Sequence, residues 1–138
     1  PKHLAFVGGR SMARALKRCA EGGFSGQLWL VNPQHAELEG VTCVASIREL
    51  PCGPDAVFIA TNRELTLQTV AELAAKGAGG AICYASGFAE TGEEGERLQA
   101  ELLRAAGDMA LLGPNCYGLL AAVLKNTRRR FWTSLKGR

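Results

Sequence analysis

Short apolar runs alternate along the chain with longer segments whose apolar residues recur at helical intervals. Each run is bounded by Gly, Pro or Asn, a pattern typical of buried strands. Strands are therefore expected at residues 3–8, 27–31, 41–44, 55–60, 80–85 and 109–113, the run at 41–44 being the weakest.

The segments between these runs predict helices. The first expected helix ends at Gly22-Gly23, and the later ones end near Lys76-Gly77 and Gly107. The apolar face of the first helix consists of Met12, Ala15, Leu16, Cys19 and Ala20, and that of the second of Leu67, Val70, Ala71 and Ala74. Three pairs have capping-box spacing and predict helix starts: Ser46 with Glu49, Thr61 with Glu64, and Thr91 with Glu94.

Strands and helices that alternate with short connections predict a parallel sheet covered on both faces, because each parallel crossover needs a helix to return the chain. We therefore expect an α/β fold, a doubly wound and Rossmann-like domain. Sheets of this type bind ligands beyond the carboxyl ends of their strands. The turns expected to meet there are residues 8–11, 32–34, 61–64, 86–88 and 114–116.

The size and composition fit one globular domain. The chain has 138 residues, of which 47% are apolar and 21% charged, values typical of soluble α/β proteins. No apolar run approaches the roughly 20 residues that a membrane span needs, and the start of the chain lacks a signal-peptide layout. We expect a cytoplasmic protein without membrane association. The five cysteines show no C-x-x-C pairing and there are only two histidines, so no metal site is expected.

The positive charge is concentrated near the carboxyl-terminal end of the sequence. Six of the 16 Lys and Arg residues lie in residues 125–138, which hold no acid, so the remaining 10 face 13 acidic residues. The rest of the chain thus has a net charge of −3. A single short basic segment is more often solvated than bound to nucleic acid. We do not expect nucleic-acid binding.

The first turn departs from the fingerprint of nicotinamide dinucleotide sites. At the three glycine positions of G-x-G-x-x-G this chain has Gly8, Arg10 and Ala13. The acid that usually ends the second strand and holds the ribose is replaced by Asn32-Pro33. The sequence also has no Walker A motif and no G-x-S-x-G elbow. Helix N-termini remain, and these suit a phosphate-bearing ligand without any catalytic group.

Three stretches, "VNPQHAELEGVTCVASIRELP", "ASGFAETGEEG" and "GPNCYGLL", resemble the coenzyme A (CoA) binding domain of NDP-forming acyl-CoA synthetases. This group includes ADP-forming acetyl-CoA synthetases and, more distantly, the succinyl-CoA synthetase alpha subunit. The resemblance implies a Rossmann-like CoA-binding domain over residues 1–120, with residues 121–138 as a basic tail outside the fold. It also implies that the ligand is CoA or acyl-CoA and that the partners are other domains or subunits of an acyl-CoA ligase.

The resemblance further implies which residues surround CoA. The first turn lies near the phosphates, the end of the second strand near the adenosine, and residues 115–116 near the thiol. It implies no catalytic residue and no metal ligand in this chain. The expected binding residues are Gly8, Gly9, Arg10, Ser11, Val31, Asn32, Pro33, Thr61, Asn62, Ser86, Gly87, Phe88, Asn115 and Cys116.

Several of these residues also have a purely structural interpretation. Glycine at Gly8 and Gly9 is expected under both the structural and the CoA-binding interpretation, because close backbone approach or positive φ requires glycine. Four further residues have alternative structural roles: Arg10 as a solvated arginine, Phe88 as a core aromatic, Asn115 as a helix cap and Cys116 as an inert buried thiol.

The chain departs from the family pattern in three places. The first loop is shorter and less rich in glycine, Gln34 stands where lysine is frequent, and Asn62 stands where proline is frequent. Members that complete the ligase reaction use a phosphohistidine and an ATP-grasp domain, and neither is found in this sequence. We therefore expect one module of a ligase that makes no acyl-CoA by itself.

Two other function classes stay open on the sequence alone. They are a stand-alone CoA-binding or sensing protein and an NAD(P)-binding oxidoreductase domain. The motifs "GPNCYG" and "SGFAETG" favour the ligase module over the first, and Arg10 with Asn32 disfavours the second.

Overall fold

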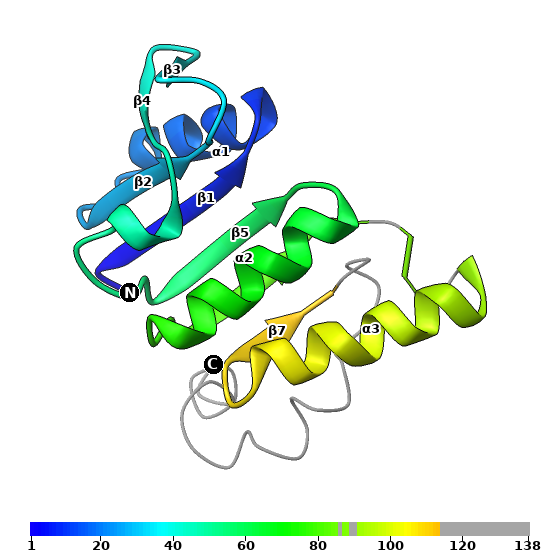
Figure 1. Ribbon diagram of the computed structural model, residues 1–138. Helices are drawn as coiled ribbons and strands as arrows, with labels where there is room; N and C mark the ends of the chain where they lie inside the picture. The colour runs from blue at the N-terminus through cyan, green and yellow to red at the C-terminus, as the bar shows by residue number, and fades with distance from the viewer. Residues whose placement is uncertain (86, 89–90, 114–138) are drawn as a thin grey trace.

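The computed structural model describes residues 1–85, 87–88 and 91–113 (Figure 1). Strands and helices alternate there, as the apolar pattern predicts. The expectation that residues 121–138 lie outside the fold concerns residues beyond these ranges. The elements are β1 (His3–Gly8), α1 (Arg10–Glu21), β2 (Gln27–Val31), β3 (Glu37–Leu38), β4 (Val41–Val44), η1 (Ile47–Glu49), β5 (Ala56–Ala60), α2 (Arg63–Ala75), β6 (Gly80–Cys83), α3 (Glu93–Ala106) and β7 (Ala110–Leu112).

Within the described ranges, the strands form one seven-stranded sheet in the order β3-β4-β2-β1-β5-β6-β7. β1 pairs in parallel with β2 on one side and with β5 on the other, and the parallel pairing continues to β4 and β7. The chain therefore builds outward from β1 in one direction and then returns to build the other half. This order creates a switch point between the carboxyl ends of β1 and β5. The doubly wound α/β fold is confirmed.

The edge strand β3 is not predicted by the apolar pattern. It pairs antiparallel with β4, with Glu37 opposite Thr42 and Leu38 opposite Val41, so the sheet is mostly and not wholly parallel. A strand of two residues is too short to show a period in the sequence. Its tertiary pairing with β4 is what defines it.

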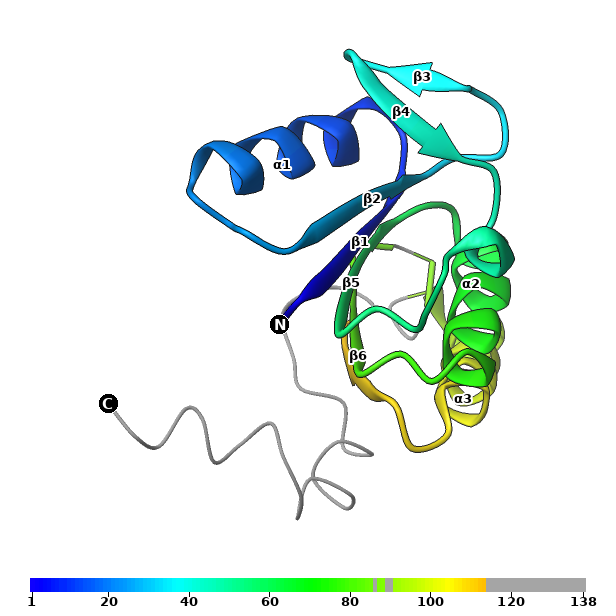
Figure 2. The same cartoon turned by 90° about the vertical axis from the view of Figure 1, so that its left-hand side faces the viewer.

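Helices cover both faces of the sheet, with α1 on one face and α2 and α3 on the other (Figure 2). β1 is therefore buried from Leu4 to Gly8 on both of its sides. Phe6 packs in the core beneath α1, where its ring stacks on Phe58 with centroids 5.1 Å apart. Val7 belongs to the second core, beneath α2 and α3. This double burial holds the end of β1 firmly in place.

The predicted apolar face of α1 is confirmed in its centre. Met12 and Leu16 are buried, together with Ala13, which lies between the predicted positions. Ala20, expected on the same face, is exposed. The buried residues of α1 therefore lie in its first half.

The start of α2 differs by one residue from the predicted capping box. Asn62 is the N-cap, and its side-chain oxygen accepts a hydrogen bond from the Leu65 amide at 2.8 Å. The hydroxyl of Thr61, the predicted cap, lies 2.8 Å from that of the buried Thr66. The prediction was wrong because the Thr61 hydroxyl pairs with the nearby Thr66 hydroxyl, which leaves the cap to the neighbouring asparagine.

Of the other two predicted helix starts, the one at Thr91 is displaced by one residue and the one at Ser46 is in place. α3 begins after Gly92, while the Thr91 hydroxyl donates to the Phe88 carbonyl at 2.8 Å. The short helix expected after Ser46 is confirmed as the 3-10 turn η1, whose N-cap is Ser46, although the Ser46 side chain makes no capping hydrogen bond. Capping-box spacing therefore places these helix starts only to within a residue or two.

Candidate functional site

The carboxyl ends of β1, β2 and β5 surround a cavity of about 330 Å³. It lies at the switch point of the sheet, where doubly wound folds bind their ligands. Its volume is at the lower end of the range for small-molecule sites. Eight of the expected binding residues line it: Gly8, Gly9, Arg10, Val31, Asn32, Pro33, Thr61 and Asn62.

Six further residues complete the lining, namely Val7, Gln34, His35, Leu38, Ala60 and Leu65. Most of them are sequence neighbours of expected residues, so the positions of the turns already pointed to them. Leu38 is different, because it comes from β3, and no sequence signal indicates that this strand folds back over the pocket.

Gly8 and Gly9 begin the first turn, but their requirements differ. Gly8 has φ +149°, and a Cβ there would lie 2.7 Å from the Ala60 carbonyl oxygen and 2.9 Å from Met12 Cγ. Gly9 has φ −91°, and a Cβ there would meet nothing within 4 Å. The structural need for glycine is thus confirmed at Gly8 and wrong at Gly9, whose open surroundings leave room for a ligand.

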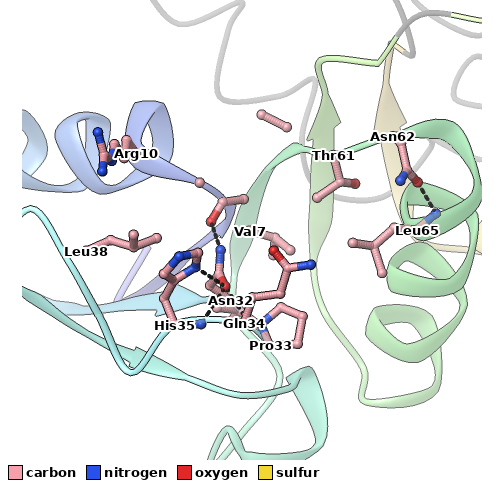
Figure 3. A pocket seen from close by; sticks show the side chains of 14 residues that line it. Val7, Arg10, Asn32, Pro33, Gln34, His35, Leu38, Thr61, Asn62 and Leu65 are labelled. Carbon is pink, nitrogen blue, oxygen red and sulfur yellow. Dashed lines mark hydrogen bonds between the residues drawn. The ribbon is translucent and has the colours of Figure 1, made fainter.

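The Asn32 side chain connects two of the strand ends (Figure 3). Its Nδ2 donates to the Gly8 carbonyl at 3.0 Å, and its Oδ1 accepts hydrogen bonds from the Gln34 amide at 2.8 Å and the His35 amide at 3.1 Å. The Asn32 amide donates to the Val44 carbonyl at 2.9 Å. Asn32 therefore fixes the relative positions of the first turn and the loop after β2.

The N-terminus of α1 faces this cavity without a cap. The N-cap Gly9 offers no side-chain hydrogen bond, and the first turn contains no acidic residue. In contrast, α2 is capped by Asn62, and the first turn of α3 holds three glutamates. The free N–H groups and partial positive charge of α1 thus remain available to an anion.

Arg10 is the one arginine or lysine among the described residues that line the cavity. Its side chain is 76% exposed, and its Nε lies 3.9 Å from Glu39 Oε1. An exposed pair at this distance holds the guanidinium weakly. Arg10 is therefore free to turn toward a bound anion.

Ser11, Gly87 and Phe88, the other expected residues that the structure describes, do not line this cavity. Ser11 lines a neighbouring apolar cavity of about 470 Å³ beneath α1. Phe88 is fully buried in the core under α2 and α3, as its structural interpretation predicts. Ser86, Asn115 and Cys116 lie outside the described residues.

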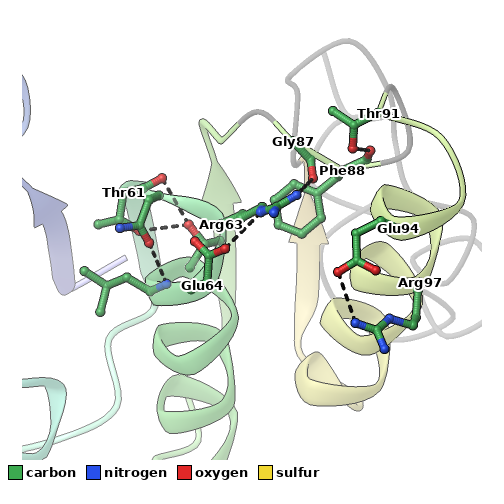
Figure 4. A network of polar contacts seen from close by, with 11 residues as sticks. Thr61, Arg63, Glu64, Gly87, Phe88, Thr91, Glu94 and Arg97 are labelled. Carbon is green, nitrogen blue, oxygen red and sulfur yellow. Dashed lines mark hydrogen bonds and ion pairs between the residues drawn. The ribbon is translucent and has the colours of Figure 1, made fainter.

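Gly87 belongs to a polar network at the start of α2 (Figure 4). Its carbonyl accepts a hydrogen bond from Arg63 Nη1 at 3.3 Å, and Arg63 Nε donates to Glu64 at 2.9 Å. The hydrogen bond from Arg63 lowers the pKa of the Glu64 carboxyl below its ordinary value. The network ties the turn after β6 to the turn after β5, which forms one wall of the cavity.

Comparison with known proteins identifies the group to which this site belongs. The family described as "CoA binding domain" matches residues 7–122. The chain belongs to this CoA-binding domain family. The resemblance inferred from its motifs is thereby confirmed, and the family is the one found in ADP-forming acyl-CoA ligases.

Among curated relatives of the CoA-binding domain, trans-feruloyl-CoA synthase FCS1 from an unknown prokaryotic organism is 38% identical over 125 residues, covering 86% of this chain. The ADP-forming acetate–CoA ligase II subunit alpha of Pyrococcus furiosus is 36% identical over 97 residues, covering 69%. The chain spans 18% and 21% of these two proteins.

A solved structure with the same fold is the apo dinucleotide-forming acetyl-coenzyme A synthetase 1 of Ca. Korarchaeum cryptofilum. Its TM-score is 0.74 at 30% identity, and the match covers 86% of this chain and 27% of that one. The domain therefore corresponds to one part of a much longer ligase chain.

Two kinds of feature are not found in the part of the domain that the structure describes. No helix there has both the length and the apolar character that crossing a membrane requires. In the same ranges, no three His, Cys, Asp or Glu side chains come together in a group that is able to hold a metal ion.

Proposed function

We propose that this domain binds coenzyme A in the cavity at the carboxyl ends of β1, β2 and β5, as the CoA-binding part of an ADP-forming acyl-CoA ligase. The observation that carries the proposal is the uncapped N-terminus of α1 facing that cavity, with Arg10 at its rim. CoA carries a pyrophosphate and a 3′-phosphate, which are the groups that such a helix end and an arginine bind.

The first turn supports this assignment of the phosphates. At Gly9 the space that a Cβ would occupy is open, so that a phosphate can approach the backbone closely. Gly8 cannot serve the same purpose, because its surroundings are filled by Ala60 and Met12. The phosphates are therefore assigned to Gly9, Arg10 and the first N–H groups of α1.

The end of β2 favours CoA over a nicotinamide dinucleotide. The ribose of such a cofactor usually binds a carboxylate at this point. Here Asn32 stands in its place, and its amide is already bonded to the backbone of Gly8, Gln34 and His35. The adenosine of CoA is assigned to Val31 and Pro33, beside this network.

The domain's own residues bind and orient CoA, and no catalytic side chain is assigned among them. The reaction that forms the acyl-CoA bond is assigned to the remaining parts of a ligase, since this chain spans about a fifth of its curated relatives. Asn115 and Cys116 remain predicted contacts of the thiol end.

Thermal unfolding with CoA, NAD, NADP and ATP tests the proposal. A ligand that binds only the native state stabilises it by about 2.7 kcal/mol at a hundredfold excess over Kd. CoA is expected to raise the Tm and NAD to leave it unchanged. Stabilisation by NAD without stabilisation by CoA would contradict the proposal.

A further inference from the structure

A glutamate outside the cavity contacts the arginine at its rim. Glu39 Oε1 lies 3.9 Å from Arg10 Nε and 3.4 Å from an Arg14 guanidinium nitrogen. Lys17 Nζ donates to the Glu39 carbonyl at 3.2 Å. Arg10 and Arg14 are one helical turn apart on α1, so one carboxylate serves both side chains.

The backbone at Glu39 is unusual for this residue type. Glu39 and Gly40 form the turn between β3 and β4, with φ values of 52° and 78°. Two-residue hairpin turns with both residues at positive φ favour Asn-Gly or Gly-Gly, and glutamate is disfavoured there. Strained residues of this kind concentrate at functional sites. A glutamate therefore stands at a position where the turn itself would favour another residue.

Both arginines are able to leave the glutamate. Their side chains are 76% and 65% exposed, whereas that of Glu39 is 29% exposed. Exposed ion pairs are weak, and a phosphate offers an arginine a stronger, bidentate contact. A phosphate in the cavity thus competes with Glu39 for Arg10 and, one turn further along α1, for Arg14.

We propose that Arg10 and Arg14 form a phosphate-binding pair and that Glu39 is its counter-ion, which determines how much the phosphates of a ligand contribute to affinity. This inference rests on the proposed function of the cavity. In the free domain Glu39 contacts both guanidinium groups. On binding, a phosphate takes at least one of them, and the remaining negative charge of Glu39 opposes the anion. Glu39 therefore lowers the affinity for phosphorylated ligands only.

Calorimetric titration of Glu39→Gln and Glu39→Asn with CoA and with pantetheine tests this assignment. Both variants remove the charge, and asparagine also suits the positive φ of the turn. At about 0.02 M salt we expect CoA to bind about threefold to tenfold more tightly to both, and the gain to shrink at about 0.5 M salt. Pantetheine carries no phosphate, so its affinity is expected to stay within about twofold.

Two further variants complete the experiment. Glu37→Gln removes the same charge from the same hairpin, where Glu37 is exposed, and its CoA affinity is expected to stay within about twofold of the unmodified domain. Arg14→Gln is expected to weaken CoA binding about threefold or more at low salt. Titration with dephospho-CoA, which lacks the 3′-phosphate, shows whether the arginines contact that phosphate or the pyrophosphate. Contact with either one supports the proposal.

The failures of the two proposals are distinguishable. If the unmodified domain binds CoA and the folded Glu39 variants bind it equally or more weakly, the counter-ion proposal is overturned while the proposed function stands. An equal gain for pantetheine also overturns it, because the change would then concern the shape of the cavity. If neither the unmodified domain nor any of its variants binds CoA, the proposed function itself fails.

Discussion

Asn32 Nδ2 donates to the carbonyl oxygen of Gly8 at 3.0 Å, so that a single side chain ties the carboxyl end of β2 to that of β1. The same amide accepts the backbone N–H groups of Gln34 and His35 through its oxygen. Both ends of an amide are needed for this arrangement, because one atom must donate while the other accepts.

Asn32→Asp is expected to destabilise the domain by about 1 to 2 kcal/mol, because a carboxylate cannot donate to the Gly8 carbonyl. CoA binding is expected to weaken about tenfold, since the new charge lies beside a site for phosphates. Urea denaturation and calorimetry measure the two effects.

Asn62→Asp is the matched control for this substitution. The Asn62 side chain is observed only to accept a hydrogen bond, from Leu65, and aspartate caps a helix as well as asparagine does. Its unfolding free energy is expected to change by less than about 0.5 kcal/mol. Equal losses of unfolding free energy in Asn32→Asp and Asn62→Asp would show that the hydrogen bond donated to the Gly8 carbonyl has no special role in stability.

The two glycines of the first turn are expected to respond differently to alanine. Gly8→Ala places a Cβ 2.7 Å from the Ala60 carbonyl at φ +149°, and we expect a loss of about 2 to 4 kcal/mol in unfolding free energy. Gly9→Ala meets no atom, so a loss of about 1 kcal/mol or less is expected.

For CoA affinity we expect the reverse order among variants that fold, with the larger loss in Gly9→Ala. Gly9→Ala is expected to weaken binding by about 1 to 3 kcal/mol, because the Cβ occupies the space assigned to a phosphate. Unchanged CoA affinity in Gly9→Ala would place the phosphates away from the first turn.

Arg10→Gln is expected to weaken CoA binding, with a larger loss at low salt than at high salt. The contact assigned to Arg10 joins a guanidinium to a phosphate in a solvated rim, and salt screens such contacts. We expect a loss of about 1 to 2 kcal/mol at about 0.02 M salt. Arg97→Gln is the control, because it removes the same charge from α3 instead of α1. Arg97 forms an ion pair with Glu94 on that same helix. Losses of equal size in both variants would argue for a general effect of net charge.

Asp55 is expected to make stability depend on acid pH. Its carboxylate accepts the backbone N–H groups of Lys2 and His3 at 2.6 and 2.9 Å, and these bonds lower the pKa of the Asp55 carboxyl in the folded state. A lowered folded-state pKa means that the contribution is present above the unfolded pKa, about 3.9, and is lost as the pH falls through the folded-state value.

Asp55→Asn is therefore expected to be less stable than the unmodified domain at pH 7, and the difference is expected to shrink as the pH falls through the lowered folded-state pKa of the Asp55 carboxyl. Denaturation curves at several pH values measure this difference, with the exposed Glu21→Gln as the control. A difference that persists unchanged at the lowest pH would show that charge on Asp55 is not its cause.

The sequence by itself determined the alternation of strands and helices, because side-chain periodicity is a local property of each segment. It also placed most of the cavity, since parallel crossovers bring the turns after strands to one edge of the sheet. Gly8, Asn32 and Thr61 are far apart in the chain, yet each follows or ends a predicted strand, and each lines the cavity.

Tertiary structure decided the features that depend on contacts across the fold. The need for glycine at position 8 arises from Ala60 on a neighbouring strand, because a Cβ at Gly8 would lie 2.7 Å from the Ala60 carbonyl oxygen. The contact between Arg10 and Glu39 requires the hairpin of β3 and β4 to fold against α1. No local period encodes such contacts, because they are made by residues whose proximity exists only once the sheet and its helices have packed together.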